Sequence, residues 1–224
     1  MDRLRDLNGL GEGINKKWIW GNKENYYCSC DCLQKIGYCI HDLNTEIENL
    51  SNPSMKEVIF IIILVDWICE ASDTLLKILD KGMVDNFVFK NEDSILKSRR
   101  FFKALRSFAV AHPLSTNRHE KYGFDGDLIC VDIRDRTSKL VEMFTHSNDW
   151  FHLDFNGVKV NTKNQSADFV LYVYSHKADG MKFFKYIGVD FKDLYCVAEL
   201  QIEKIYELDK YLKKIKKKDW LVNA

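Results

Sequence analysis

The sequence predicts a mainly α-helical protein that carries a small β insertion before its last helix. In the first half, apolar residues recur at spacings of three and four, which places them along one face of a helix. After Gly123 they alternate with polar residues, which is the period of a strand. Only two prolines, Pro53 and Pro113, occur in the 224 residues, so long helices can form. We expect an antiparallel helical bundle with a small antiparallel sheet.

Three helices are predicted in the first half. The first spans about 25–50, and its apolar stripe consists of Leu33, Ile36, Ile40, Leu43, Ile47 and Leu50. The second begins at Ser54, which forms a capping box with Glu57, and ends near residue 81. The third begins near residue 91 and ends before Pro113, because proline disfavours the helical conformation in the residue before it.

The β insertion is expected at about 125–176. Residues 128–133 and 169–174 read as strands, and Asn156-Gly157 is a two-residue hairpin signal between two further apolar segments. A last helix is expected from about residue 191, and it ends in the lysine-rich segment 213–218, where cations favour the negative end of a helix dipole. Residues 1–24, which contain four glycines, are expected to form a loose N-terminal arm, and residues 25–224 a single domain.

The balance of charge excludes a protein that binds nucleic acid through a global positive field. Lys and Arg total 33 and Asp and Glu total 33, so the formal net charge is 0. Any RNA site must therefore be local. The longest apolar run, 58–65, is far shorter than the roughly 20 residues of a membrane span, and the first residues lack a secretory pattern. We expect a cytoplasmic protein with no membrane partner.

Seven cysteines, an odd number, indicate reduced thiols rather than a disulfide framework. Cys28, Cys30, Cys32, Cys39 and His41 have the residue types of a zinc site, but they lack its usual pair of separated Cys-x-x-Cys motifs. Buried thiols between helices are the favoured interpretation. No metal and no cofactor are expected.

One segment contains candidate catalytic residues. Arg106 and His112 are separated by five residues at the end of the third helix, directly before Pro113. This pattern resembles the R-x(4–6)-H motif of the HEPN superfamily, whose members are bundles of four or five helices. Many of them are dimeric, metal-independent ribonucleases. Ser107 stands where the family more often has Asn, Asp or His, and the β insertion is not part of a minimal HEPN bundle.

Histidine and arginine are also suited to RNA cleavage on chemical grounds that do not depend on the family. Histidine can take a proton from the 2′-hydroxyl or give one to the leaving 5′-oxygen, and arginine can hold a phosphate with two hydrogen bonds. We expect His112 to transfer protons, Arg106 to bind phosphate and Ser107 to orient the site. The products would be a 2′,3′-cyclic phosphate and a 5′-hydroxyl. The alternative is that Arg106 and His112 only end a helix.

Two further sets of residues are candidates for supporting roles. Asn117, Arg118, His119 and Lys121 could contact RNA, although a polar loop without a function is the favoured interpretation. Asp66 and Glu70 lie four residues apart on the second helix and could orient Arg106 through an ion pair, or form a solvated face.

The resemblance implies a cytoplasmic endoribonuclease of the toxin or phage-defence (abortive infection) type. It would act as a homodimer on an RNA substrate, and an antitoxin or other regulatory protein would restrain it. The alternative hypothesis is a non-catalytic HEPN-like helical module that binds a protein partner or RNA. Replacing His112 with alanine separates the two, because only the enzyme requires that side chain.

Overall fold

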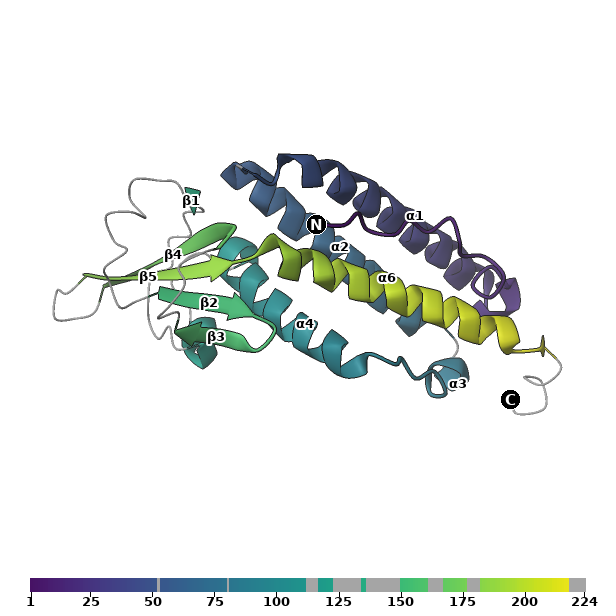
Figure 1. The fold of residues 1–224 in the computed structure, drawn as a ribbon. Helices are drawn as coiled ribbons and strands as arrows, with labels where there is room; N and C mark the ends of the chain where they lie inside the picture. The colour runs from purple at the N-terminus through teal and green to yellow at the C-terminus, as the bar shows by residue number, and fades with distance from the viewer. Residues whose placement is uncertain are drawn as a thin grey trace. The chain divides into compact units, whose positions relative to one another are not determined.

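The computed structural model describes residues 1–51, 53–79, 81–111, 117–122, 134–135, 150–160, 167–176 and 182–217. These residues form a mainly helical protein with one small mixed sheet (Figure 1). The chain divides into two compact units, where a single domain is expected from the sequence. Unit 1 comprises residues 1–45, 63–95 and 198–224, and unit 2 comprises 46–62 and 96–197. The divisions fall inside α2, α4 and α6 and before the last residue of α1, so each of these helices contributes to both units.

The predicted helices are present with slightly different ends. They are α1 (Lys23–Glu46), α2 (Met55–Ile78), the short α3 (Lys81–Val84), α4 (Glu92–Arg106) and α6 (Phe191–Lys214). The stripe of α1 is buried at Ile36, Ile40 and Leu43, as predicted, whereas Ile47 belongs to a 3₁₀ turn that follows the helix.

The capping box at the start of α2 is confirmed. The backbone N–H of Ser54 donates to the Glu57 carboxylate at 2.6 Å, and the N–H of Glu57 donates to the Ser54 hydroxyl at 3.3 Å. These bonds favour the ionised carboxylate and lower the pKa of Glu57. The local sequence pattern therefore sets where α2 begins.

The N-terminal arm is packed within unit 1, which corrects the expectation of a loose segment. Ile14, Ile19 and Trp20 are buried. The carboxylate of Asp209 on α6 accepts hydrogen bonds from the N–H groups of Gly13 and Ile14 at 2.9 and 2.7 Å. The glycines suggested mobility, but the apolar side chains between them supply enough burial to hold the arm in place.

The arm also supplies a hydrogen-bond donor to the backbone carbonyl groups at the end of α6. The ammonium group of Lys16 donates to the carbonyl oxygens of Leu212, Lys213 and Ile215 at 2.7 to 2.9 Å. Carbonyls at the end of a helix have no partner within it and carry partial negative charge, so a cation is favourable there.

Unit 2 contains the sheet, in the order β1-β4-β5-β2-β3. Its strands are β1 (Arg134–Asp135), β2 (Trp150–Asp154), β3 (Gly157–Val160), β4 (Phe169–His176) and β5 (Lys182–Val189). The hairpin at Asn156-Gly157 is confirmed: it joins β2 to β3, and Gly157 adopts a φ of 97° that favours glycine. Residues 128–133, where a strand is predicted, lie outside the described residues.

The expected antiparallel sheet is wrong in one respect, because β2 and β5 pair in parallel. The hairpin takes the chain away from β2, and β5 later returns on its other side. Trp150 on β2 lies opposite Tyr186 on β5, and their rings stack with centroids 4.7 Å apart. Both side chains are buried, so this pair ties the two strands together.

We predict that Gly13→Ala lowers the free energy of unfolding by about 1–3 kcal/mol, as overpacking does elsewhere. A Cβ atom at residue 13 would collide with the backbone carbonyl of Asp209 and lie 2.7 Å from the amide nitrogen of Lys213. Gly37→Ala in α1 is the matched control, because its Cβ would meet nothing within 4 Å. It should stabilise the helix by about 0.5–1 kcal/mol. Urea unfolding of both variants tests this; equal effects would contradict the packed arm.

Candidate nucleic-acid interface

Arg106 is the last residue of α4, and the chain continues directly as a π-helix, Ser107–Ala111. Arg106 and Ser107 are both half-buried. His112 follows immediately but lies outside the described residues, so its distance from Arg106 stays a prediction. Short π-helical turns are rare and often accompany functional sites.

Ser107 contacts a residue that the sequence analysis assigned to RNA binding. Its hydroxyl lies 3.0 Å from Nε2 of His119, which belongs to the 3₁₀ turn Asn117–Tyr122. The His119 ring is fully buried and packs edge-on against Phe108, with centroids 4.8 Å apart. The expectation that His119 contacts RNA is therefore corrected, because a side chain without exposed surface cannot reach a ligand in solvent. Its role is to dock the turn onto the π-helix.

The same turn brings Tyr122 and Lys121 to a groove. Tyr122 packs edge-on against Phe108 at 5.1 Å, and the Lys121 ammonium lies 4.8 Å from the centre of the Tyr122 ring. Of the four residues predicted to bind RNA, Lys121 is the one that the described structure places in the groove lining. For Asn117 and Arg118 the structure describes only their place in the turn.

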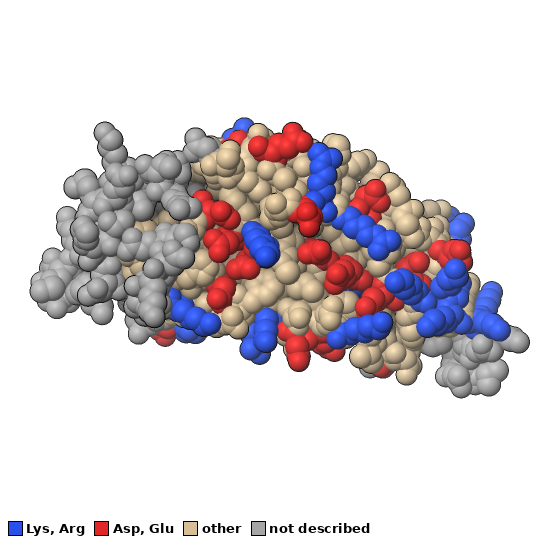
Figure 2. All heavy atoms as spheres, in the orientation of Figure 1, with Lys and Arg blue, Asp and Glu red and all other residues tan. Residues whose placement is uncertain are grey.

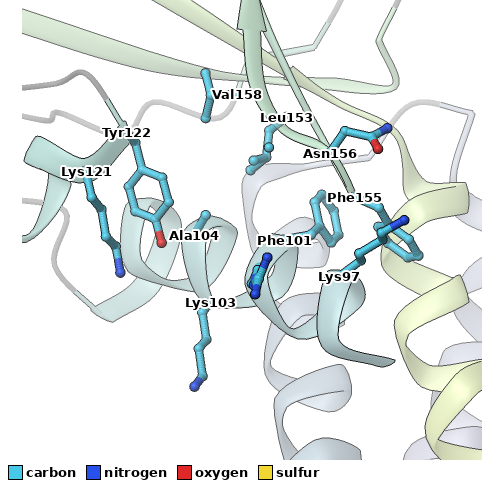
Figure 3. Close-up of a pocket in the computed structure, with 12 residues that line it drawn as sticks. Lys97, Phe101, Lys103, Ala104, Lys121, Tyr122, Leu153, Phe155, Asn156 and Val158 are labelled. Carbon is cyan, nitrogen blue, oxygen red and sulfur yellow. The ribbon is translucent and has the colours of Figure 1, made fainter. Parts of the chain in front are cut away.

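This basic groove lies within unit 2 and has a volume of about 660 Å³ (Figure 3). It is formed by α4, by the turn that holds Lys121 and by the β2–β3 hairpin. Its lining residues are Lys97, Arg100, Phe101, Lys103, Ala104, Lys121, Tyr122, Leu153, Phe155, Asn156, Gly157 and Val158. Four of the twelve are cations and none is acidic, so the groove has a local positive potential in a protein of zero net charge.

The aromatic residues of the basic groove differ in accessibility. Phe101 is buried and packs against Phe155, with ring centroids 5.4 Å apart. Phe155 and Tyr122 are half-buried and present part of their rings to the groove. These two rings are suited to stacking on a planar ligand group, and the cations are suited to binding an anion beside it.

The sequence contains a pattern of cations that indicates this groove and lies mostly outside the Arg106–His112 motif. Lys97, Arg100, Lys103 and Arg106 recur every three residues along α4. Residues three apart are neighbours on a helix surface, so the four cations form a winding row. Arg106 is therefore next to Lys103, which lines the groove. Over most of the visible face acidic and basic side chains are interspersed, and several basic side chains gather at its right end (Figure 2).

The predicted link between Arg106 and the acidic pair on α2 stays a prediction. Asp66 and Glu70 belong to unit 1, whereas Arg106 belongs to unit 2. Glu70 is exposed, and its backbone carbonyl accepts a hydrogen bond from the Thr74 hydroxyl.

The cysteines of α1 are half-buried at positions 28, 30 and 32, and only Cys39 among these four is buried as expected. Burial and the neighbouring Cys28 thiol raise the pKa of Cys32 to about 11, so this residue stays a protonated thiol at neutral pH. In the described part of the chain, the cysteines do not gather with histidine or carboxylates into a metal-ligand group.

A group of side chains that could hold a metal ion lies instead in unit 2, at residues that the sequence did not indicate. His152, Asp190 and Asp193 bring their ligand atoms within 4.8 Å of one another. Burial, followed by the nearby carboxylates of Asp190 and Asp154, raises the pKa of Asp193. The only sequence signal was a histidine on a strand and two aspartates around a helix start, which are far apart along the chain.

Comparisons with known proteins do not assign this chain to a family. No protein-family model, curated protein or solved structure gives a significant match. Within the described residues, no helix has both the length and the apolar character required to cross a bilayer. The resemblance to HEPN proteins therefore rests on the Arg106–His112 spacing and on the helical composition alone.

We predict that Ser107→Ala lowers the free energy of unfolding by about 1 kcal/mol, since it removes the hydrogen bond to the buried His119 ring. Ser94→Ala is the matched control, because Ser94 is an exposed residue of α4, the helix that leads into the π-helix of Ser107. It should change stability by less than about 0.5 kcal/mol. Chemical denaturation measures both values; identical values would show that the contact does not hold the turn.

Proposed function

We propose that this protein binds single-stranded RNA in the basic groove and cleaves it without a metal ion, as an endoribonuclease of the HEPN type. The observation that carries the proposal is the combination of four cations and two accessible aromatic rings in one groove, next to Arg106 on the same helix. The mainly helical fold is compatible with a HEPN-like antiparallel bundle, which is part of the proposal.

The groove chemistry favours a single strand over a duplex. Lysine and arginine side chains bind backbone phosphates, and aromatic rings stack on bases that are not already stacked in a helix. Lys97, Lys103 and Lys121 are exposed and can turn toward phosphates, while Tyr122 and Phe155 supply the ring faces. Because stacking accepts any base, we expect modest sequence preference from this part of the site.

Cleavage requires groups beyond this groove. In the proposed step a base removes the proton of the 2′-hydroxyl, the 2′-oxygen attacks phosphorus, and the bond to the 5′-oxygen breaks as that oxygen receives a proton. His112 is proposed for proton transfer and Arg106 for stabilising charge on the phosphorane. In a homodimer, one His112 can accept the proton while the other donates it.

The proposal keeps the orienting role of Ser107. It acts on the site through His119, by positioning the turn that carries Lys121 and Tyr122. A toxin or abortive-infection effector, held in check by a partner protein, is the proposed biological setting.

Lys103→Ala should weaken binding of a single-stranded oligonucleotide for every sequence tested. It should also reduce the slope of log Kd against log salt by about 0.7, the value for one phosphate contact on a single strand. Lys192→Ala is the matched control, because Lys192 is exposed in unit 2 but does not line the groove. Fluorescence anisotropy at several salt concentrations measures the slopes; equal loss in both variants would place the RNA elsewhere.

His112→Ala should reduce RNA cleavage at least 100-fold, in line with the usual contribution of a proton-transfer group. Arg106→Ala should do the same, while both variants still bind RNA in the groove. The assay is incubation of total RNA with purified protein in excess EDTA, with Lys192→Ala as control and end-group analysis for the cyclic phosphate. Binding without cleavage by the wild type would favour the non-catalytic RNA-binding module, and cleavage by His112→Ala at the wild-type rate would contradict the proposed mechanism.

A further inference from the structure

The second titratable cluster of unit 2 draws its members from two elements. His152 lies on β2, Asp190 directly precedes α6, and Asp193 is in the first turn of that helix. Nε2 of His152 lies 3.4 Å from Oδ2 of Asp190, and one carboxylate oxygen of Asp193 completes a group within 4.8 Å. All three side chains are half-buried, so the group is partly shielded from water yet reachable from solvent.

The parallel pairing of β2 and β5 sets the position of the His152 imidazole near the start of α6. His152 is the register partner of Gly188, two residues before Asp190. A Cβ atom at residue 188 would lie 2.8 Å from the Cβ of Ala167 and 3.5 Å from Nδ1 of His152. Glycine at this position therefore avoids a clash with Ala167, and the His152 ring lies beside residue 188 at ordinary contact distance. The cluster follows from the register of the sheet and does not depend on flexible loops.

Stabilisation of the helix dipole explains only part of this arrangement. Two aspartates at a helix start are favourable. However, the N–H of Phe191 donates to the carboxylate of Asp168, at 2.8 Å. In the part of the chain that the structure describes, the Asp193 carboxylate has no hydrogen-bond or ion-pair partner, and Asp190 has only His152. The dipole also gives no reason for a histidine, which would be repelled when protonated.

We propose that His152, Asp190 and Asp193 bind one divalent transition-metal ion, with Zn²⁺ as the best chemical match. Imidazole nitrogen and carboxylate oxygen are both zinc ligands, with bonds of about 2.0–2.2 Å. Ligand atoms around a tetrahedral ion are then about 3.3 Å apart, and the 3.4 Å between His152 and Asp190 already fits. A rotamer change would bring the Asp193 carboxylate to the ion as the third protein ligand. A water molecule would occupy the fourth coordination position.

This site is separate from the basic groove. Successive side chains of a strand point to opposite faces of the sheet. Leu153 lines the groove, so His152 points to the other face. The ion would fasten β2 to the start of α6 and neutralise its two carboxylates. It is therefore proposed as a metal site that takes no part in RNA cleavage, and its test does not depend on the proposed nuclease.

The test is calorimetric titration of the full chain, without a histidine tag and freed of metal by a chelator, with Zn²⁺. One saturable site is expected, and the affinity should fall at least tenfold in His152→Ala and in Asp193→Asn, because loss of a group that only orients a ligand already costs about 10–100-fold. His41→Ala is the matched control, since His41 is exposed on α1 in unit 1, and it should bind as the wild type does.

Thermal unfolding provides a readout that does not depend on calorimetry. A ligand that binds the folded state raises its melting temperature, so Zn²⁺ should raise the Tm of the wild type and of His41→Ala but not of Asp193→Asn. Asp193 is only half-buried and asparagine is similar in size, so this variant should fold even where His152→Ala does not. No saturable Zn²⁺ binding by the wild type, or unchanged binding by the folded Asp193→Asn variant, would overturn the proposal.

Discussion

The basic groove of unit 2 depends on one partly buried contact, in which the Ser107 hydroxyl lies 3.0 Å from Nε2 of the His119 ring. This contact, together with the edge-on packing of Phe108 against His119 and Tyr122, fixes a short 3₁₀ turn at the end of α4. A turn of six residues has too few internal hydrogen bonds to hold its own shape. Its packing therefore decides where Lys121 and Tyr122 lie, and with them one wall of the groove.

The parts of the fold that follow from local signals were predictable. The capping box at Ser54, the apolar stripe of α1 and the hairpin at Gly157 each involve residues only a few positions apart. The docking of the arm onto Asp209 and the parallel pairing of β2 with β5 join residues far apart in the chain. Periodicity reports which face of an element is apolar but not which element covers it, so these features could not be predicted.

The candidate site likewise has some features that the local sequence predicts and others that depend on residues far apart in the chain. The row of cations at Lys97, Arg100 and Lys103 is visible in the sequence, because helix geometry makes residues three apart into neighbours. The burial of His119 is not visible, since a histidine between polar residues has the composition of an exposed loop. Its environment is set by Phe108, eleven positions away. Similarly, nothing in the sequence near His152 indicates Asp190 and Asp193, which reach it only through the pairing of β2 with β5.

The α-to-π transition after Arg106 bears on how the motif residues could work together. On a continuous α-helix, residues six positions apart differ by about 600° of rotation, so Arg106 and His112 would lie about 120° apart. A π-helical turn contains more residues than an α-helical turn. The five residues Ser107–Ala111 therefore change the direction in which the chain leaves Arg106. An insertion of this kind costs stability unless packing offsets it, and the buried Phe108 and Ala109 supply that packing. The sequence thus places a π-helical turn between the two residues that the proposed chemistry must align.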